Sequence, residues 1–492
     1  MRKKSAVIES PPPDVTHPRP GLLIAALALV ALTVAVLQTA VVPVLGTIAD
    51  QLNASPVAVS WAVTANLLAA AAATPLIGRL ADLHNKKHVL LGVLVVVLIG
   101  SILAATTSSL ALLIVARVLQ GVSFALYPVC VAVLRDELAE DAVVRALALL
   151  SATLGFGGGT GLVVTGLLMD GNAGYHRVFW LTTGFTLAVI VVAAVVVPSR
   201  KRSAEGTIDW LGAAGLAAGL SALLLTVTQG NSWGWTTPRT IGVAILGMGI
   251  LVAWWQWERR RPHPLVSTTM LTRRAVLYTN LATVFVGMGL YFGFLGLTEF
   301  VQIDREVAGY GFSATVLHAS VVFLLPGAIA GFVTASLSGR FIDRFGARPV
   351  LMCGAVTGIV GFVWLAVAHS QPWQVVAAGI FVNAYISLGY GALPALVVSE
   401  VDSRETGVAT GVNAIARTVG SSVAAALVAV LLSRSVADTD LPAEHAFVLI
   451  FIGGAVTAAL AMVLIVLSRS SRAEARLAEG TIDSRAMNHE WG

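Results

Sequence analysis

The sequence has little charge and little cysteine for a chain of 492 residues. Only 12% of the residues are charged and 57% are hydrophobic, a composition unsuited to a water-soluble protein. Cys130 and Cys353 both fall in apolar stretches, so we predict no disulfide. The chain lacks a P-loop, an H-E-x-x-H motif and the Cys/His spacing of a metal site. With no polar segment long enough for a soluble domain, we do not expect a kinase, an ATPase or a DNA-binding module.

Long apolar stretches are what the chain has instead. A hydrocarbon core about 30 Å thick needs roughly 20 apolar residues per helical crossing. The unbroken apolar runs 93–99 and 187–197 do not alternate as barrel strands do. We therefore predict an all-α, polytopic membrane protein with fourteen transmembrane helices, near residues 21–48, 56–78, 88–106, 109–134, 146–169, 178–198, 209–228, 240–257, 275–303, 314–338, 349–368, 373–399, 407–433 and 445–468.

The positive charge of the loops predicts the orientation. With the N-terminus in the cytoplasm, the outer loops contain only Arg177, Arg239, Arg305 and Arg434 of the 31 Lys and Arg residues. Basic residues in short loops stay in the cytoplasm, so we expect a multi-pass protein of the cytoplasmic membrane with both termini cytoplasmic. The polar ends 1–20 and 469–492 are predicted to be cytoplasmic tails, the first of them disordered. The net charge of +5 suits anionic lipid headgroups and gives no reason to expect nucleic acid.

An internal repeat divides the chain. The segment GRLADLHNKKHVL at 78–90 aligns with GRFIDRFGARPVL at 339–351. The repeat predicts an N-terminal six-helix bundle at 21–200 and a C-terminal six-helix bundle at 263–468, with two additional central helices at 201–262. Paired bundles of this kind are typical of alternating-access carriers.

Sequence motifs run in a consistent order along the whole chain. The motif G-x-L-A-D-x-x-G-R-K-x-x-L is matched at Gly78, Leu80, Ala81, Asp82, Lys86 and Lys87, and R-x-x-Q-G is matched at Arg117, Gln120 and Gly121. Further matches are Asp209-Trp210-Leu211-Gly212, Trp233-Gly234-Trp235, Glu258-Arg259-Arg260, Pro264-Leu265, Gly411, Asn413, Arg417 and Gly420. Together they resemble the major facilitator superfamily, in its fourteen-spanner drug:proton antiporter family of the multidrug efflux type.

Two departures from the family pattern affect the expected mechanism. Exporters of this superfamily typically carry G-x-x-x-G-P-x-x-G-G in the fifth helix. The best match here is Gly157, Gly161 and Gly166, with Leu162 in place of the proline. We expect these glycines to make a flexible hinge and to allow close helix approach. An acidic residue that the family places in the first helix is replaced by Val34.

Ionisable residues deep in membrane helices are costly and are therefore candidates for coupling. Arg117, next to Gln120, is predicted to act in coupling or to be a purely structural partner of polar groups. Glu299 and His318 are candidates for proton binding, the alternative being wetted residues at the membrane interface. Arg417 belongs either to a core ion pair or to the side chains that extend to the cytoplasm.

The repeated loops predict a latch between the two halves on the cytoplasmic side. The resemblance implies that their acidic and basic residues bias the outward-facing state. A carboxylate such as that of Asp82 can also face a helix N-terminus, whose dipole favours negative charge. The alternative is that the basic residues only enforce topology. The predicted latch residues are Gly78, Arg79, Asp82, Lys86 and Lys87, with Gly339, Asp343, Arg344 and Arg348 as counterparts.

A substrate cavity is expected between the halves, because the resemblance implies which helices line it. Aromatic, amide and thioether groups suit amphiphilic molecules. For each residue the alternative is ordinary helix packing. The expected lining residues are Gln38, Trp61, Asn66, Phe124, Tyr127, Tyr278, Asn280, Met288, Tyr291, Asn383 and Tyr385.

Three classes of function follow. The first is proton-driven export of lipophilic drugs or metabolites, working as a monomer with no cofactor and no metal. The second is a metabolite carrier that works as an uptake symporter or without protons, which the missing proline keeps open. The third, a membrane-embedded enzyme or sensor, is disfavoured because the sequence shows no paired intramembrane acids.

Overall fold

The computed structural model describes residues 20–41, 44–169, 174–200, 209–262, 264–401, 405–432 and 441–468, and within these ranges every regular element is a helix. The predicted all-α fold is confirmed for this part of the chain. The predicted tail 469–492 lies outside the described residues, as does 1–20 except for Pro20. Pro20 is the first residue of α1 rather than part of a tail, because a proline is tolerated in the first turn of a helix.

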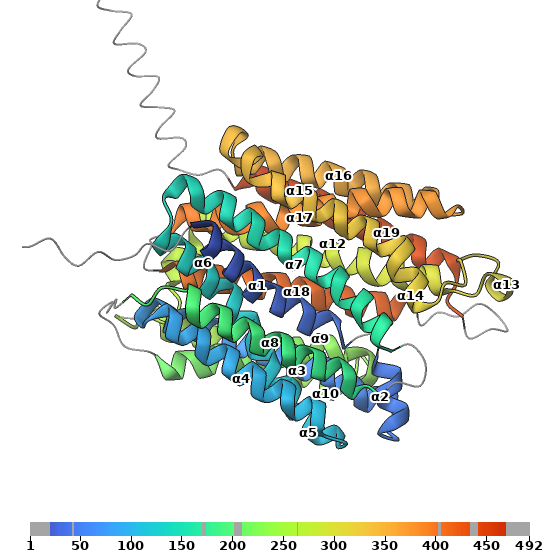
Figure 1. The fold of residues 1–492 in the computed structure, drawn as a ribbon, viewed down its shortest axis with the longest axis horizontal. Coiled ribbons are helices and arrows are strands. Elements are labelled where there is room, and N and C mark those ends of the chain that lie inside the picture. Colours follow the sequence, from blue (N-terminus) through green and yellow to red (C-terminus); the bar gives the residue numbers. More distant parts are fainter. Residues whose placement is uncertain are drawn as a thin grey trace, which may run out of the picture.

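The first half of the chain forms one bundle around a shared apolar core, in which α1 packs on α7 and α4 packs on α8. Figure 1 shows these helices running side by side along the long axis of the molecule. The elements are α1 (Pro20–Thr39), α2 (Leu45–Gln51), α3 (Pro56–Leu83), α4 (Lys86–Thr106), α5 (Leu110–Gly121), the 3-10 turn η2 (Val122–Ala125), α6 (Leu126–Glu137), α7 (Glu140–Leu168) and α8 (His176–Val196).

The second half forms a bundle with its own core, which includes the fully buried rings of Phe362, Phe447 and Phe451. Here α16 packs on α17 and α19, and α12 packs on α18. The elements are α12 (Arg274–Gln302), α13 (Arg305–Ala308), α14 (Val316–His318), the π-helix η3 (Ala319–Leu324), α15 (Leu325–Phe345), α16 (Ala347–Val367), α17 (Pro372–Glu400), α18 (Thr406–Leu432) and α19 (Glu444–Leu467).

The central pair α9 (Trp210–Trp233) and α10 (Pro238–Glu258) lies between the halves in sequence and is followed by the short α11 (Thr268–Thr272). Helix α9 contacts both α3 and α18. Near its end, the Gln229 amide donates to Thr64 Oγ1 of α3 at 3.2 Å. The Asn231 amide donates to the carbonyl of Ala426 in α18 at 3.2 Å. The inserted pair is therefore attached to both bundles.

Helix starts follow from local sequence. Ser55 caps α3, accepting from the N–H of Ala58 at 3.2 Å. Asn85 caps α4, accepting from the N–H of Lys87 at 3.0 Å. Such side chains satisfy backbone N–H groups that have no partner within the helix. Asn85 itself has an extended backbone, with φ −63° and ψ 111°.

Within the described residues, 13 helices are long and apolar enough to cross a membrane. The expected segment 146–169 falls in α7, which is a continuous helix but is not among the 13, so the count of fourteen is not confirmed. The expected crossing 21–48 is wrong at its end, because α1 stops at Thr39 and the apolar run continues into the separate helix α2. Composition alone does not separate α1 from α2, because both helices are apolar.

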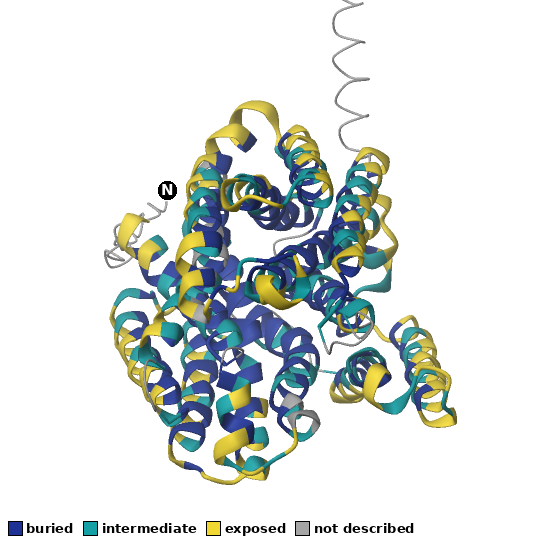
Figure 2. Ribbon diagram, turned by 90° about the vertical axis from the view of Figure 1, so that its right-hand side faces the viewer, coloured by how far each residue is buried: buried dark blue, intermediate teal, exposed yellow. Residues whose placement is uncertain are grey.

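Apolar side chains cover the outside of the bundles. Val195 and Val367 are 79% exposed and Ile245 is 67% exposed. Figure 2 shows exposed residues on the outer faces and buried ones on the faces that meet inside. A surface of this kind is costly in water and is satisfied by lipid, which makes the chain a multi-pass membrane protein.

Candidate functional site

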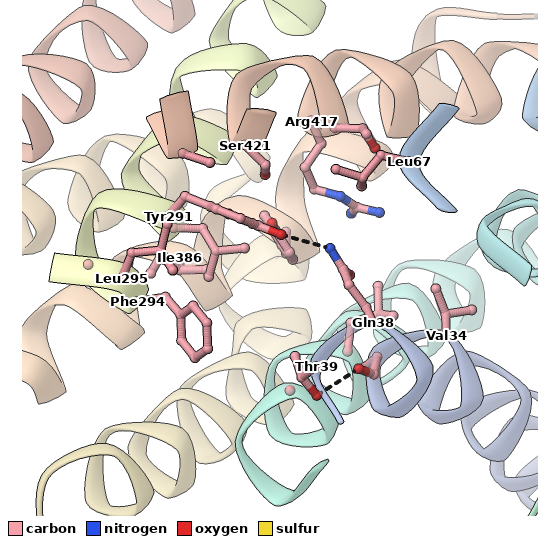
Figure 3. A pocket seen from close by; sticks show the side chains of 18 of the residues that line it. Val34, Gln38, Thr39, Leu67, Tyr291, Phe294, Leu295, Ile386, Arg417 and Ser421 are labelled. Atoms are coloured by element: carbon pink, nitrogen blue, oxygen red, sulfur yellow. Dashed lines mark hydrogen bonds between the residues drawn. The ribbon is translucent and has the colours of Figure 1, made fainter. Parts of the chain in front are cut away.

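A cavity of about 310 Å³ lies between the two bundles. Its wall is built by α1, α2, α3, α5, η2 and α7 from the first bundle and by α12, α15, α17 and α18 from the second, with η3 at its edge. Most lining side chains are apolar, with a few amides, hydroxyls and two guanidinium groups among them. Figure 3 shows three of these polar side chains, Gln38 from the first bundle and Tyr291 and Arg417 from the second, reaching into the cavity. The volume suits a small organic molecule.

The structure places only some of the predicted cavity residues in this wall. Gln38, Asn66, Phe124, Tyr291 and Asn383 line the cavity. The side chains of Gln38 and Tyr291 meet across the two bundles, since the Gln38 amide donates to Tyr291 Oη at 3.2 Å (Figure 3). This hydrogen bond joins α1 to α12. The lining set does not include Trp61, Tyr127, Tyr278, Asn280, Met288 or Tyr385.

Packing inside the second bundle accounts for most of the residues outside the wall. Tyr385 is 2% exposed. Its ring packs so closely on Gly289 and Gly358 that Cβ atoms there would lie only 2.9 and 2.5 Å from it. Asn280 accepts from the amide of Asn413 at 3.0 Å, a contact between α12 and α18. Met288 packs on the second core, Tyr278 lies near Arg274 in the first turn of α12, and Trp61 lies half-buried near the start of α3.

Arg117 is buried, at 1% exposure, and fixes three helices of the first bundle. Its Nε donates to the carbonyl of Ala62 at 3.1 Å, and its Nη1 donates to the carbonyl of Leu37 at 3.2 Å. Nη1 also donates to Gln120 Oε1 at 2.7 Å, and the Gln120 amide donates to Ser101 at 2.9 Å. The guanidinium thus has carbonyl and amide partners on α1, α3 and α5, which compensate for its burial.

Arg417 adopts neither of its two expected environments. Its guanidinium lies 4.6 Å from the ring centroid of Tyr390 and 5.5 Å from that of Tyr127. Tyr127 Oη lies 2.9 Å from Ser151 Oγ, which donates to the carbonyl of Tyr390 at 2.8 Å. Among the described residues Arg417 has no ion pair, and it lines the cavity. Cation–π contact and the open cavity replace the expected carboxylate.

Glu299 and His318 lie outside the cavity. Both are exposed, Glu299 near the end of α12 and His318 in α14. The imidazole of His318 lies 5.9 Å from the ring of Phe323. Their surroundings fit the alternative of residues near the membrane interface, and the proton-binding role stays a prediction.

The predicted latch lies at the end of the molecule that we call the basic end, which carries the loops after α3, α6, α8, α10, α15 and α17. Asp82 Oδ1 accepts from the N–H of Gly407 and its Oδ2 from the N–H of Val408, both at 3.1 Å. These N–H groups belong to the first turn of α18, so a carboxylate of the first bundle faces a helix N-terminus of the second. A Cβ atom at Gly78 would lie 2.8 Å from the carbonyl oxygen of Gly407, so glycine permits this close approach.

The repeat counterpart joins α15 to α7. A Cβ atom at Gly339 would lie 2.9 Å from Arg145 Cα, and Asp343 Oδ2 lies 3.6 Å from Arg145 Nε. Arg344 does not join this contact, because its guanidinium lies 5.2 Å from the ring of its neighbour Phe345. Arg348 donates to the carbonyl of Ser468 within its own bundle.

Among the described residues, no hydrogen bond or ion pair joins the basic residues of the first loop to the second bundle. Lys86 forms an ion pair with Asp136 of α6. Lys87 uses its backbone N–H on the Asn85 cap, and Arg79 Nε is buried with no hydrogen-bond partner in the described part of the chain. The cross-bundle contact thus depends on the acid rather than on the bases of this loop.

Sequence reasoning missed Arg135, which crosses between the bundles. It lies in the last turn of α6 and donates to Thr406 Oγ1 and to the carbonyl of Val401, the latter at 3.2 Å. The signal available in the sequence was a basic residue at the end of a helix, and such residues usually only set topology. Arg135 and Asp82 together bind Val401, directly after α17, and the first turn of α18.

The predicted hinge glycines of α7 differ from one another. A Cβ atom at Gly157 would lie 2.5 Å from Leu32 Cδ1, and one at Gly161 would lie 2.4 Å from Thr39 Oγ1. These two glycines therefore let α7 approach α1 closely. Near Gly166 the closest atom would be Leu317 Cδ1 at 3.7 Å, so a side chain there has room.

Two helix bundles that face each other across a cavity, closed at one end by contacts between them, define the class of membrane transporters. The sequence matches the model of the Major Facilitator Superfamily over residues 27–425 and 319–485. The chain therefore belongs to this superfamily.

Relatives agree with this assignment. A uridine/deoxyuridine transporter of Lactococcus lactis subsp. cremoris (strain MG1363) is 27% identical over 367 residues, 73% of this chain and 74% of that protein. A multidrug resistance protein B homolog of Mycobacterium tuberculosis (strain ATCC 25618 / H37Rv) is 25% identical over 390 residues, 76% of this chain and 69% of that protein. The first is named as a transporter and the second as a multidrug resistance protein, and neither is named as an enzyme. The predicted resemblance to drug-efflux members of the superfamily is confirmed.

A solved structure supports the fold. The human organic anion transporter MFSD10 (TETRAN) superposes with a TM-score of 0.63 at 13% sequence identity. The superposition covers 92% of this chain and 100% of that one. The likeness shows a common arrangement of helices.

Proposed function

We propose that this chain is a secondary active transporter that exports lipophilic drugs or metabolites by alternating access, driven by a proton gradient. The observation that carries the proposal is the cavity between the bundles, beneath which Asp82 and Arg135 of one bundle hold the α18 end of the other. The largely apolar wall with scattered amides and hydroxyls suits amphiphilic molecules. The multidrug resistance relative favours export.

We place the chain in the cytoplasmic membrane with the basic end and both termini in the cytoplasm, because basic loops are retained there. In this orientation the contacts of Asp82 and Arg135 close the cytoplasmic side, as in an outward-facing or occluded state. We propose a monomer that needs no cofactor and no metal, whose partners are the amphiphilic substrate, protons and the lipid bilayer. Glu299 and His318 are the proposed proton sites, so protons and substrate would bind at separate places.

The test is efflux of a fluorescent lipophilic dye from a pump-deficient bacterial host that expresses the chain. We expect efflux that stops on addition of a protonophore and that is about 100-fold slower in the Asp82→Asn variant at equal membrane expression. The matched control is Asp304→Asn, an exposed acid next to α13 that makes no contact between the bundles. Efflux that persists after the proton gradient has been removed would contradict proton coupling.

The second candidate is a carrier that works in the other direction or without protons. Two observations favour it: no carboxylate lines the cavity among the described residues, and one relative is named a uridine/deoxyuridine transporter. Cells expressing such a carrier would accumulate labelled uridine faster than control cells. An exporter would leave uridine uptake unchanged and lower dye accumulation.

A further inference from the structure

The charge of the cavity wall has one sign. Within the described part of the chain, the charged side chains of the wall are Arg117 and Arg417, and no Asp, Glu, Lys or His accompanies them. The two arginines differ in what they already bind. Arg117 is buried and bonded to two carbonyls and to Gln120, whereas Arg417 is only half-buried. The charge available to a ligand is therefore that of Arg417.

The surroundings of Arg417 hold its guanidinium without neutralising it. The rings of Tyr127 and Tyr390 contact the group, and a chain of hydrogen bonds through Ser151 joins these tyrosines. An aromatic face attracts a cation but accepts none of its five N–H bonds in the way a carboxylate does. No hydrogen bond from the Arg417 side chain to a described residue is found. Figure 3 shows the guanidinium reaching from α18 into the cavity toward Gln38 and Val34.

Arg417 also lies at the depth where the cavity ends. It is the twelfth residue of α18, and Tyr390 of α17, Tyr127 of α6 and Ser151 of α7 lie at similar distances from the basic ends of their helices. At about 1.5 Å per residue this level is roughly 15 Å from the basic end. Beyond it, toward that end, Asp82, Arg135 and Asp343 join the bundles. An arginine at the closed end of a largely apolar cavity favours a ligand with an anionic head and an apolar body.

We propose that Arg417 is a substrate-binding residue that selects amphiphilic anions, such as carboxylates or sulfonates on an aromatic skeleton, over cations. The anionic group of the ligand accepts the free N–H groups of Arg417 in a charge-assisted, bidentate bond. The aromatic skeleton lies toward the opposite end, against Tyr291, Phe294 and Leu295, which line the cavity there. This inference names the substrate class of the proposed transporter and so rests on the proposed function.

The test measures binding to the purified full-length chain in detergent by fluorescence polarisation. The two probes share a xanthene skeleton: carboxyfluorescein, which is anionic, and a rhodamine methyl ester, which is cationic. We expect the wild-type chain to bind the anion more tightly and Arg417→Gln to bind it at least about tenfold more weakly, a loss of about 1.4 kcal/mol. Arg417→Lys should keep part of the affinity, because it keeps the charge but loses the planar fork.

Two further variants separate the proposal from a folding defect. Ser421→Asp places a carboxylate one turn after Arg417 on the same helix, in the wall, and should abolish anion binding while the arginine stays in place. Arg305→Gln removes the same charge at an exposed residue of α13 and should bind as wild type does. A cooperative thermal unfolding transition is the control that each variant is folded.

The outcomes are distinct. Equal affinity of the wild type for both probes, no affinity for the anion, or unchanged anion binding by Arg417→Gln overturns the proposal. Selective anion binding that is lost in Arg417→Gln and in Ser421→Asp supports it. Normal anion binding without export from cells would count against the proposed direction of transport, not against the Arg417 site.

Discussion

The two repeated loops place similar residues in different surroundings at the basic end. Asp82 is 9% exposed and accepts two backbone N–H groups from the first turn of α18. Asp343 lies at the surface, 3.6 Å from Arg145, and the two side chains are 36% and 55% exposed. Gly78 and Gly339 both allow close helix approach. Both repeated loops thus have a close helix contact, but only the loop of Asp82 has a buried polar contact.

This difference has an energetic meaning. Hydrogen bonds to a charged group contribute about 1.5–3 kcal/mol each when they are shielded from water. An exposed ion pair contributes about 0–1 kcal/mol. We therefore expect the closed basic end to depend on the contact of Asp82 far more than on that of Asp343. The following experiments test this inequality, beginning with the largest expected effect.

Asp82→Asn and Asp343→Asn compare the two acids directly. Asparagine at 82 places an amide N–H against one of the two backbone N–H groups of α18, so one bond is lost and the other loses its charge. We expect transport to fall about 100-fold for Asp82→Asn, which corresponds to nearly 3 kcal/mol, and less than about threefold for Asp343→Asn. Dye efflux at matched expression measures both. Similar losses in the two variants would remove the asymmetry.

Gly78→Ala and Gly339→Ala test the feature that the two loops share. The new methyl group would lie 2.8 Å from the carbonyl oxygen of Gly407 in one case and 2.9 Å from Arg145 Cα in the other. Overpacking of this kind costs about 1–3 kcal/mol, so each variant should lose about tenfold in transport. Gly92→Ala is the control, because a Cβ atom there meets nothing within 4 Å. A tenfold difference between the two variants would show that the helix contacts also differ.

Arg135→Ala tests a second contact between the bundles that lies beside the contact of Asp82. The variant removes the bonds to Thr406 and to the carbonyl of Val401 while leaving Asp82 in place. We expect about fivefold slower transport, because the lost bonds lie partly in water. Single cysteines introduced near α18 should react faster in this variant with a thiol reagent that is added from the basic side. Arg135→Lys serves as the control and should recover part of the rate.

A double-mutant cycle with Asp343→Asn and Arg145→Gln gives the smallest effect. The coupling between the two side chains should be below about 1 kcal/mol in thermal unfolding and should decrease at high salt. A coupling above about 2 kcal/mol would mean that this pair is as strong as a buried one.

The sequence predicts the contacts at the basic end better than it predicts the residues that line the cavity. Asp82 belongs to a motif with fixed spacing, and its side chain in α3 faces the N-terminus of α18, as expected of such a carboxylate. Arg135 belongs to no motif, and its partners at 401 and 406 lie more than 260 residues away along the chain. A contact of this kind depends on how the bundles meet, which no local pattern contains.

The cavity shows why helix faces are hard to predict in a membrane protein. Asn383 and Tyr385 lie two residues apart on α17, about 200° around the helix, and only Asn383 lines the cavity. In a soluble helix the apolar stripe would indicate the inner face, but here both the lipid face and the core face are apolar. The residue type of Tyr385 therefore predicts a place in the cavity, whereas its ring fills the second core beside Gly289 and Gly358.

We expect the attachment of α9 to the two bundles to restrict how they move against each other. Its amide bonds to Thr64 and Ala426 come from Gln229 and Asn231, within one helical turn, whereas its contacts nearer Leu216 are apolar. Hydrogen bonds are directional, and apolar contacts tolerate sliding. Because α9 is hydrogen-bonded to both bundles near one of its ends only, it opposes translation of the bundles there but not their tilting. In the proposed alternating-access transporter, we therefore expect the inserted pair to oppose sliding of one bundle past the other and to allow the bundles to tilt.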